Sequence, residues 1–193
     1  RHYGLAAVLQ ADWVLASSRE SLAETAWNAA LRERCFALLG DALVTRAQAG
    51  SEIWGFLPLP NAVDPFFRSA ARRLMARLRD APLVACEDGT LVPPTSCIVS
   101  AAPVLRAELA PVLSSLGLSV VAPDAVPPPI RVAMAMRGET STLALRVLAA
   151  AATGERPPAF WAAAWAWAAT VLDVPDRARA GELVAFPSEG PDG

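Results

Sequence analysis

The sequence predicts an α+β fold in which a mixed sheet carries packed helices and is followed by an alanine- and tryptophan-rich helical hairpin. Segments with apolar residues at every third or fourth position, which are typical of amphipathic helices, are interspersed along the chain with short apolar runs that are typical of strands. An Asp88-Gly89 pair between two such runs is a hairpin signature, because glycine readily adopts the positive φ of a tight turn. Helices that alternate with strands indicate helices packed on a sheet.

The composition of the 193 residues indicates a folded chain, with 54 % hydrophobic and only 19 % charged residues. A net charge of -2 leaves no electrostatic footprint for nucleic acid, so we expect no nucleic-acid partner. The three cysteines, Cys35, Cys86 and Cys97, are widely spaced and the one histidine is His2. We therefore predict no metal site and no Ser-His or Cys-His nucleophile, and reduced thiols in a cytoplasmic or nuclear protein.

The first element we expect is a strand over residues 5–15, which are mostly apolar with polar residues at alternate positions. The tetrapeptide Ser21-Leu22-Ala23-Glu24 has capping-box form and predicts the start of a long helix. Trp27 is predicted to be a core anchor on the apolar face of that helix. The whole predicted face consists of Leu22, Ala26, Trp27, Ala30, Leu31, Cys35, Leu38, Leu39, Ala42 and Leu43.

Arg19 is the main candidate for a functional residue, with Ser18 and Glu20 on either side of it. It lies between the predicted strand and the predicted helix, where rigid elements would hold its guanidinium at an exposed edge. An arginine in that position offers a planar set of donors to a phosphate or carboxylate. The alternative is a local role, in which Arg19 pairs with Glu20, Glu24 or a helix carbonyl.

A second helix is predicted from Pro65, because Asp64 and Pro65 form an N-cap and N1 pair. The preceding segment contains Pro58 and Pro60 and is expected to be a packed connection without a central strand. The helix itself is rich in arginine, which suggests either a phosphate or RNA patch or a solvated face opposite acidic neighbours. The absence of lysine and of interleaved exposed aromatics favours the solvated face. The cluster comprises Arg68, Arg72, Arg73, Arg77 and Arg79.

After the hairpin, residues 104–116 predict a helix that is interrupted near Pro111, and the run Gly117–Pro123 predicts one more strand. Proline-rich residues 123–129 favour a domain boundary. We therefore expect an α/β region over residues 1–122, a proline-rich linker over 123–139, a helical hairpin over 140–174 and a mobile tail over 175–193. The uncharged run 157–172 is shorter than the roughly twenty residues that a bilayer requires, so no membrane partner is expected.

The run ADWVLASSRES at residues 11–21 and the run WNAALRERCFALLGDAL at 27–43 carry a family resemblance. They resemble the segment that follows the histidine-kinase/chaperone-type (GHKL) ATPase domain in sacsin-like and NO VEIN-like proteins. The segments GFLPLP, DPFF and LRDAPLVACEDGTLVPP are also similar, so the resemblance spans residues 5–122. The matching positions are Asp12, Trp13, Ser18, Arg19, Glu20, Trp27 and Asn28.

More distantly, Ser18-Arg19-Glu20 resembles the catalytic loop in the middle domain of the ninety-kilodalton heat-shock chaperone. That resemblance implies that Arg19 contacts the γ-phosphate of a nucleotide held by a preceding domain. The chaperone has an asparagine three residues before the arginine and a glutamine one helical turn after it, where this chain has Ala16 and Ala23. We therefore expect the phosphate contact without the remainder of that loop's chemistry.

The same resemblance implies that the chain is part of a longer polypeptide, with the upstream ATPase domain as its partner and a protein client as a second partner. ATP and Mg²⁺ would be bound by the parent protein, with no cofactor in this chain, because no phosphate-binding glycine motif is present. The isolated chain is expected to be inactive. The alternative is a structural protein-interaction module, in which the tryptophan-rich hairpin offers an apolar surface and ATP hydrolysis has no part.

Overall fold

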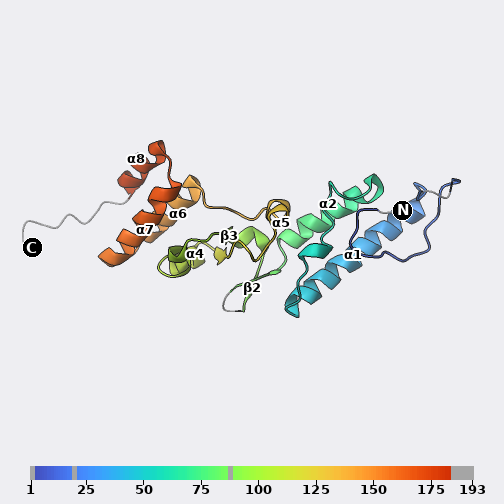
Figure 1. Cartoon of the computed structure of the whole chain (residues 1–193), viewed down its shortest axis with the longest axis horizontal. Coiled ribbons are helices and arrows are strands. Elements are labelled where there is room, and N and C mark those ends of the chain that lie inside the picture. The colour runs from blue at the N-terminus through green and yellow to red at the C-terminus, as the bar shows by residue number, and fades with distance from the viewer. Residues whose placement is uncertain (1–2, 19–20, 87–88, 184–193) are drawn as a thin grey trace, which may run out of the picture. The chain divides into compact units, whose positions relative to one another are not determined.

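A computed structural model of the chain describes residues 3–18, 21–86 and 89–183 (Figure 1). The chain forms two compact units. The first unit contains residues 1–97 and 124–136, and the second contains residues 98–123 and 137–193. The chain therefore passes from one unit to the other after Cys97, after Pro123 and after Met136.

Two long helices form the body of the first unit. Helix α1 (Ala26–Gln48) begins where the Thr25 side chain accepts a hydrogen bond from the Asn28 backbone N–H at 3.1 Å. Helix α2 (Pro65–Arg79) begins where the Asp64 carboxylate accepts from the Phe66 N–H at 3.0 Å, which confirms the predicted Asp64-Pro65 start. The 3₁₀-helix η1 (Trp54–Phe56) lies in the connection between them.

An aromatic cluster centred on Phe67 joins these helices to the beginning of the chain. The Phe67 ring stacks on Phe36 of α1, with centroids 5.9 Å apart. Tyr3 and Trp13 meet the same ring edge-on, at 5.4 and 5.9 Å, and Phe66 does so at 4.9 Å. Aromatic pairs in these geometries add roughly 0.5–1.5 kcal/mol each beyond the area they bury. This cluster therefore fixes α1, α2 and the N-terminal segment to one another.

The face of α1 that packs inward differs from the predicted one. The buried residues are Asn28, Phe36, Gly40, Leu43 and Ala47. Trp27 is 56 % exposed and Leu38 is 68 % exposed, so the prediction that Trp27 is a core anchor is wrong. Alanines and leucines occur all round this helix, so that periodicity alone fits more than one face. The close approach of α2 at Gly40 selects the face that is buried.

Two ion pairs bridge α1 and α2 along the edge of their interface. Arg73 pairs with Glu33 at 2.5 Å, and Arg77 pairs with Asp41 at 2.5 Å. These contacts confirm the predicted solvated face opposite acidic neighbours for two of the five arginines on α2. All four side chains keep substantial solvent exposure, so each pair contributes little stability by itself.

The predicted strand over residues 5–15 does not form a paired strand. Throughout residues 3–13, side chains alternate between half-buried and exposed positions, as the period-two pattern suggested. Tyr3, Leu5, Leu9 and Trp13 pack against the core of the first unit. Helices rather than a neighbouring strand lie beneath this segment, so it runs in an irregular conformation without ladder hydrogen bonds, and one isolated bridge follows at Leu15.

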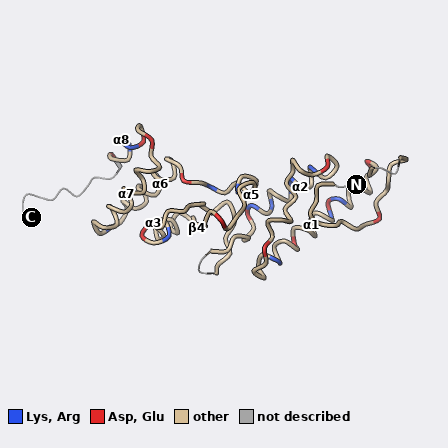
Figure 2. The backbone as a smooth tube through the Cα atoms, in the orientation of Figure 1, with Lys and Arg blue, Asp and Glu red and all other residues tan. Residues whose placement is uncertain are grey.

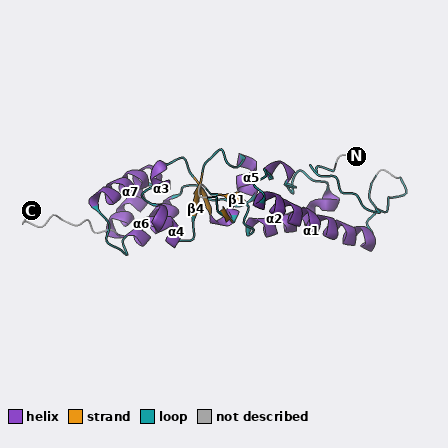
Figure 3. Cartoon of the chain, turned by 90° about the horizontal axis from the view of Figure 1, so that it is seen from below, coloured by secondary structure: helices purple, strands orange, loops and turns teal. Residues whose placement is uncertain are grey.

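The strands of the described chain are short and form two separate two-stranded sheets (Figure 3). In the first unit, β1 (Val84–Ala85) pairs antiparallel with β2 (Leu91–Val92), and Gly89 adopts a φ of 81°. The predicted hairpin is thus confirmed, although Asp88 itself lies outside the described residues. The 3₁₀-helix η2 (Pro94–Ser96) follows. The α+β class is confirmed, but one mixed sheet covered by helices is absent from the described residues.

The proline-rich segment predicted to be a linker is part of the first unit. Helix α5 (Pro128–Ala133) starts directly after Pro127, because a proline at the first helical positions loses no helix hydrogen bond. Val126, Ile130 and Met134 are buried in the same core as Phe67. The prolines therefore initiate a helix that completes this core, and they do not form an extended spacer.

The second unit is mainly helical. Strand β3 (Cys97–Val99) pairs with β4 (Ser119–Val121), and helices α3 (Pro103–Arg106) and α4 (Ala110–Ser115) lie between them in sequence. This agrees with the predicted helix interrupted near Pro111. Helices α6 (Ser141–Ala151) and α7 (Pro158–Val171) match the two predicted alanine-rich helices. Helix α8 (Val174–Leu183) includes residues 175–183 of the predicted mobile tail, and the rest of that tail lies outside the described residues.

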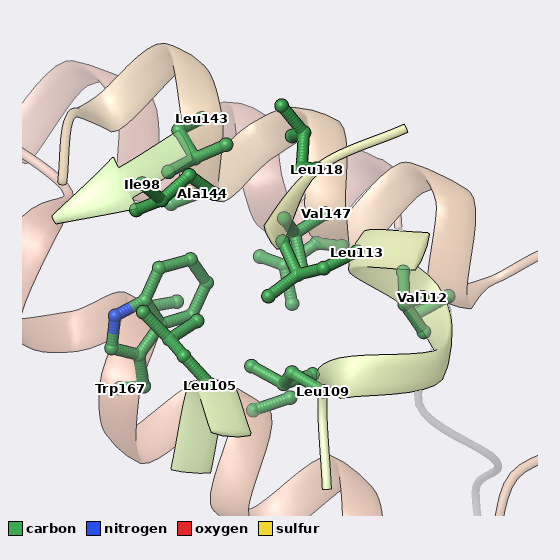
Figure 4. Close-up of a cluster of buried hydrophobic side chains, with 14 of the residues drawn as sticks. Ile98, Leu105, Leu109, Val112, Leu113, Leu118, Leu143, Ala144, Val147 and Trp167 are labelled. Carbon is green, nitrogen blue, oxygen red and sulfur yellow. The ribbon is translucent and has the colours of Figure 1, made fainter. Parts of the chain in front are cut away.

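The core of the second unit takes up most of the aromatic surface of α7. Figure 4 shows Leu105, Val147 and Trp167 among the side chains of one buried cluster. Phe160 and Trp167 are buried, and Trp161 and Trp165 pack partly buried against the cluster. Glu139 accepts hydrogen bonds from Trp167 Nε1 at 2.6 Å and from Ser100 Oγ at 2.5 Å. The tryptophan-rich hairpin is therefore mainly a packing element.

The Gly40 contact provides a stability test with a matched control. A Cβ atom built on Gly40 would lie 2.8 Å from Leu74 Cδ1 and 3.1 Å from Arg77 Nη1, whereas one on helical Gly181 would meet nothing within 4 Å. We expect Gly40→Leu to lower the free energy of unfolding by about 1–3 kcal/mol, because overpacking must push α1 and α2 apart. Gly181→Leu should not destabilise the chain. Urea denaturation followed by circular dichroism would measure both, and equal effects would contradict the assignment.

Candidate functional site

The residues on either side of positions 19 and 20 form a short two-stranded stem before α1. Leu15 and Leu22 form an isolated antiparallel bridge. The Ala16 N–H donates to Ser21 O at 2.9 Å, and the Ala23 N–H donates to Val14 O at 2.9 Å. We call residues 12–25 the stem loop. Ser18 is exposed in the turn of the stem loop, whereas Arg19 and Glu20 lie outside the described residues.

The side chain of Asn28 ties both sides of the stem loop to the first turn of α1. Its Oδ1 accepts from the Val14 N–H at 2.9 Å. Its Nδ2 donates to Val14 O at 2.6 Å and to Ala23 O at 2.8 Å. Asn28 is fully buried, so these bonds satisfy polar groups that water cannot reach. The stem is therefore held by the helix as well as by its own backbone contacts.

The helix begins later than the sequence predicts. Thr25, and not Ser21, is the N-cap residue, so the capping box proposed for Ser21 and Glu24 is wrong. Ser21 is instead engaged by its backbone carbonyl in the stem. Ala16 and Ala23, which replace the chaperone's asparagine and glutamine, contribute backbone bonds to the same stem. The described residues on either side of positions 19 and 20 thus pair with each other before the helix begins, and no strand runs directly into the helix.

Exposed apolar side chains lie beside the stem loop. Val14 is 44 % exposed, Leu15 is 51 % exposed and Trp27 is 56 % exposed. The Trp27 Nε1 donates to Asp12 O at 2.9 Å, which holds the indole against the stem loop. We call these three residues the loop patch. Exposed apolar and aromatic side chains of this kind occur in many protein interaction surfaces.

Helix α2 carries a cluster of arginines (Figure 2). Arg32 and Arg73 both contact the Glu33 carboxylate. Partial burial acts to raise the pKa of Glu33, but the hydrogen bonds and charges of Arg73 and Arg32 outweigh it, so this pKa lies below its usual value. Arg79 donates from Nε and Nη2 to Ala133 O at 3.0 and 2.8 Å.

The cysteines and acidic residues form no recognisable metal or redox centre in the described residues. All three cysteines are free thiols, and Cys97 is buried while Cys35 and Cys86 are half-buried. Burial, with a smaller contribution from Cys86, raises the pKa of the Cys97 thiol to about 12. No group of three His, Cys, Asp or Glu side chains that could hold a metal ion occurs there. In the same part of the chain, no helix has the length and apolar character needed to span a bilayer.

Comparisons of this chain with protein-family models, with curated proteins and with solved structures found no match. The function proposed below therefore rests on the motif resemblance and on the contacts within the chain.

The residue that organises this site is Asn28, which the sequence marks only through its place in the Trp27-Asn28 match. The available signal was an amide side chain three residues after a threonine, inside an otherwise apolar helix start. Such a residue has helix-capping potential, but its three contacts to the stem loop depend on the path of the preceding chain. That path cannot be read from local pattern alone.

The Asn28 contacts predict a measurable loss in Asn28→Ala. We expect the free energy of unfolding to fall by about 1–3 kcal/mol, because Val14 and Ala23 lose buried hydrogen-bond partners. Limited proteolysis should also cleave residues 14–23 faster than in the unmodified chain. The control is Arg34→Ala, at an exposed position on α1, which should stay within about 0.5 kcal/mol. We call the three hydrogen bonds of the Asn28 side chain the Asn28 clamp. Unchanged proteolysis of Asn28→Ala would show that this clamp does not hold the stem loop.

The Glu33 contacts predict a pH-dependent contribution to stability. Because the folded pKa of Glu33 is depressed, its pairing stabilises the fold above the unfolded value of about 4.3 and is lost as the pH falls through the lower folded pKa. We expect the urea midpoint to decline less steeply with falling pH in Glu33→Gln than in the unmodified chain. Glu24→Gln, at an exposed position before α1, is the control. The same change of slope in both variants would refute the assignment.

Proposed function

We propose that this chain is a non-catalytic module of a larger chaperone-like ATPase and that its stem loop directs Arg19 to a nucleotide bound by a preceding domain. The observation that carries the proposal is the Asn28 clamp, which fixes both sides of the stem loop to α1. An arginine that approaches a γ-phosphate stabilises the charge that develops during phosphoryl transfer. The motif resemblance to sacsin-like and NO VEIN-like proteins supplies the nucleotide as the target.

Preorganisation explains why a clamped stem suits this role. A catalytic arginine is most effective when its backbone needs no rearrangement as charge develops. Leu15, Ala16, Ser21 and Leu22 meet across the stem, and Asn28 anchors its base at Val14 and Ala23. Residues 14–16 and 21–23, which flank Arg19 in the sequence, are therefore held in place by hydrogen bonds on both sides.

The loop patch offers a docking surface for the preceding domain. Val14, Leu15 and Trp27 expose apolar surface beside the stem loop. Burying such side chains against a partner domain contributes about 25 cal/mol per Å² of apolar surface. Contact at this patch would place the partner next to Ser18, which directly precedes Arg19 in the sequence.

ATP and Mg²⁺ belong to the preceding domain in this proposal. The sequence has no G-x-x-x-x-G-K-[ST] loop, and a single added arginine does not make a nucleotide site. The chain alone is therefore expected to hydrolyse no ATP. A protein client would be a further partner of the assembled protein.

The second candidate is a protein-interaction module that takes no part in ATP hydrolysis. The exposure of Trp27 favours it, because aromatic residues are enriched in interface cores. The surface concerned is the loop patch, since the tryptophans of α7 pack against the core of the second unit. In this case the stem loop is a docking element and Arg19 is one of its polar residues.

Hydrolysis by a polypeptide that includes the preceding domain separates the two functions. We expect Arg19→Ala to lower kcat by about 10²-fold with little change in nucleotide affinity, because its charge acts on the transition state. Asn28→Ala should lower kcat by a smaller factor, and Arg34→Ala should leave it unchanged. ATP turnover and nucleotide binding would both be measured.

Unchanged turnover in Arg19→Ala would reject the role of Arg19. If Trp27→Ser then abolished association of the chain with the preceding domain, the interaction module would be the correct description.

A further inference from the structure

The first unit contains a pocket of about 670 Å³ on the side of α2 opposite its arginine-carboxylate pairs. Its walls come from the connection before α2, from α2 itself and from α5. Pockets of roughly 300–1,000 Å³ are of the size that binds small organic molecules. The pocket is independent of the stem loop, and the proposed ATPase role makes no use of it.

The charge on α2 is divided between its two sides. Arg73 and Arg77 face α1 and are neutralised by Glu33 and Asp41. Arg72 and Arg79 line the pocket, and no acidic side chain is among the residues that line it. Within the described part of the chain, neither Arg72 nor Arg79 forms a salt bridge. The pocket therefore presents two positive charges that have no counter-ion among the described residues.

Arg79 and Arg72 differ in their contacts. The Arg79 guanidinium is fixed by its two hydrogen bonds to Ala133 O on α5. A carbonyl oxygen positions this cation but does not neutralise it. Arg72 lies about two helical turns away from Arg79 along α2, at an exposed position where its guanidinium can bind an anion. Arg79 thus provides a positive charge held by hydrogen bonds, and Arg72 provides an exposed guanidinium with several hydrogen-bond donors.

The remaining walls are largely apolar. Leu59 and Pro60 contribute one side, Met75 lies at the base, and Val132 of α5 forms part of the rim. Val132 is 82 % exposed, whereas Ile130 and Met134 on either side of it are buried. An apolar group in the pocket would cover Val132 and Met75 together.

We infer that this pocket binds a small organic anion with an apolar body, its carboxylate or phosphate held by Arg72 near Arg79 and its hydrocarbon part lying against Met75 and Val132. The two positive charges account for the anionic group, because arginine binds carboxylate and phosphate through paired donors. The apolar walls account for the body. Neither feature alone would distinguish this ligand class from a bare anion or a neutral hydrocarbon.

The methyl groups of the three methionines provide a direct probe of the pocket. Met75 lines it, whereas Met134 and Met136 do not. The chain labelled with ¹³C at the methionine methyls would be titrated with octanoate and octyl phosphate, and with octanol, acetate and inorganic phosphate as matched compounds. We expect the Met75 signal to shift with octanoate or octyl phosphate, half-saturating below about 1 mM. Octanol, acetate and inorganic phosphate should bind at least tenfold more weakly.

Two variants test the role of the charge. Arg72→Gln should weaken binding of the octyl anion at least tenfold, whereas Arg72→Lys should retain part of it. Arg73→Gln is the matched control on the same helix, because Arg73 pairs with Glu33 outside the pocket. It should bind as the unmodified chain does, with circular dichroism confirming that each variant is folded.

Several results would overturn the inference. Equal affinity for octanol and octanoate would show a hydrophobic surface without anion recognition. Unchanged binding in Arg72→Gln would remove the proposed anion contact, and the absence of any Met75 shift would place binding elsewhere. The relative affinity of octanoate and octyl phosphate identifies which head group the two arginines prefer.

Discussion

The ring of Phe67 is the contact on which the arrangement of the first unit depends. It packs against Phe36 of α1 and against Tyr3 and Trp13 of the N-terminal segment. Because Trp13 lies at the start of the stem loop, the aromatic cluster also sets where that loop leaves the body of the unit. Asn28 then holds the stem loop with hydrogen bonds. The aromatic contacts therefore determine where the stem loop lies, and the hydrogen bonds of Asn28 determine its backbone conformation.

The same packing divides the surface of α2 into two chemically different sides. The side toward α1 matches each arginine with a carboxylate, and the side toward α5 gathers positive charge beside apolar walls. The sequence alone presents these arginines as one dense cluster. Their separate roles follow from the helical turn, which places Arg72 and Arg73 about 100° apart around the axis. Arg72 therefore lines the pocket, whereas Arg73, its neighbour in sequence, pairs with Glu33.

The elements that the sequence predicted well are those with local chemical signals. Asp64-Pro65 favours a helix start, and Gly89 permits the positive φ of a hairpin turn, so both elements could be predicted from local sequence. The predictions failed where tertiary contact decides. Trp27 has the spacing of a core residue, but the approach of α2 at Gly40 buries another face. Arg19, the main site prediction, lies outside the described residues, and the importance of Asn28 emerges only when its three partners are brought together.

The first unit is assembled from two stretches of sequence that are separated by part of the second. Val126, Ile130 and Met134 belong to the core around Phe67, yet they follow β3, α3, α4 and β4 in the chain. During synthesis on the ribosome, α1 and α2 must therefore wait for α5 while residues 98–123 emerge ahead of it. Until then the apolar surface that α5 covers faces water, and this interval is when the nascent chain most needs protection from aggregation.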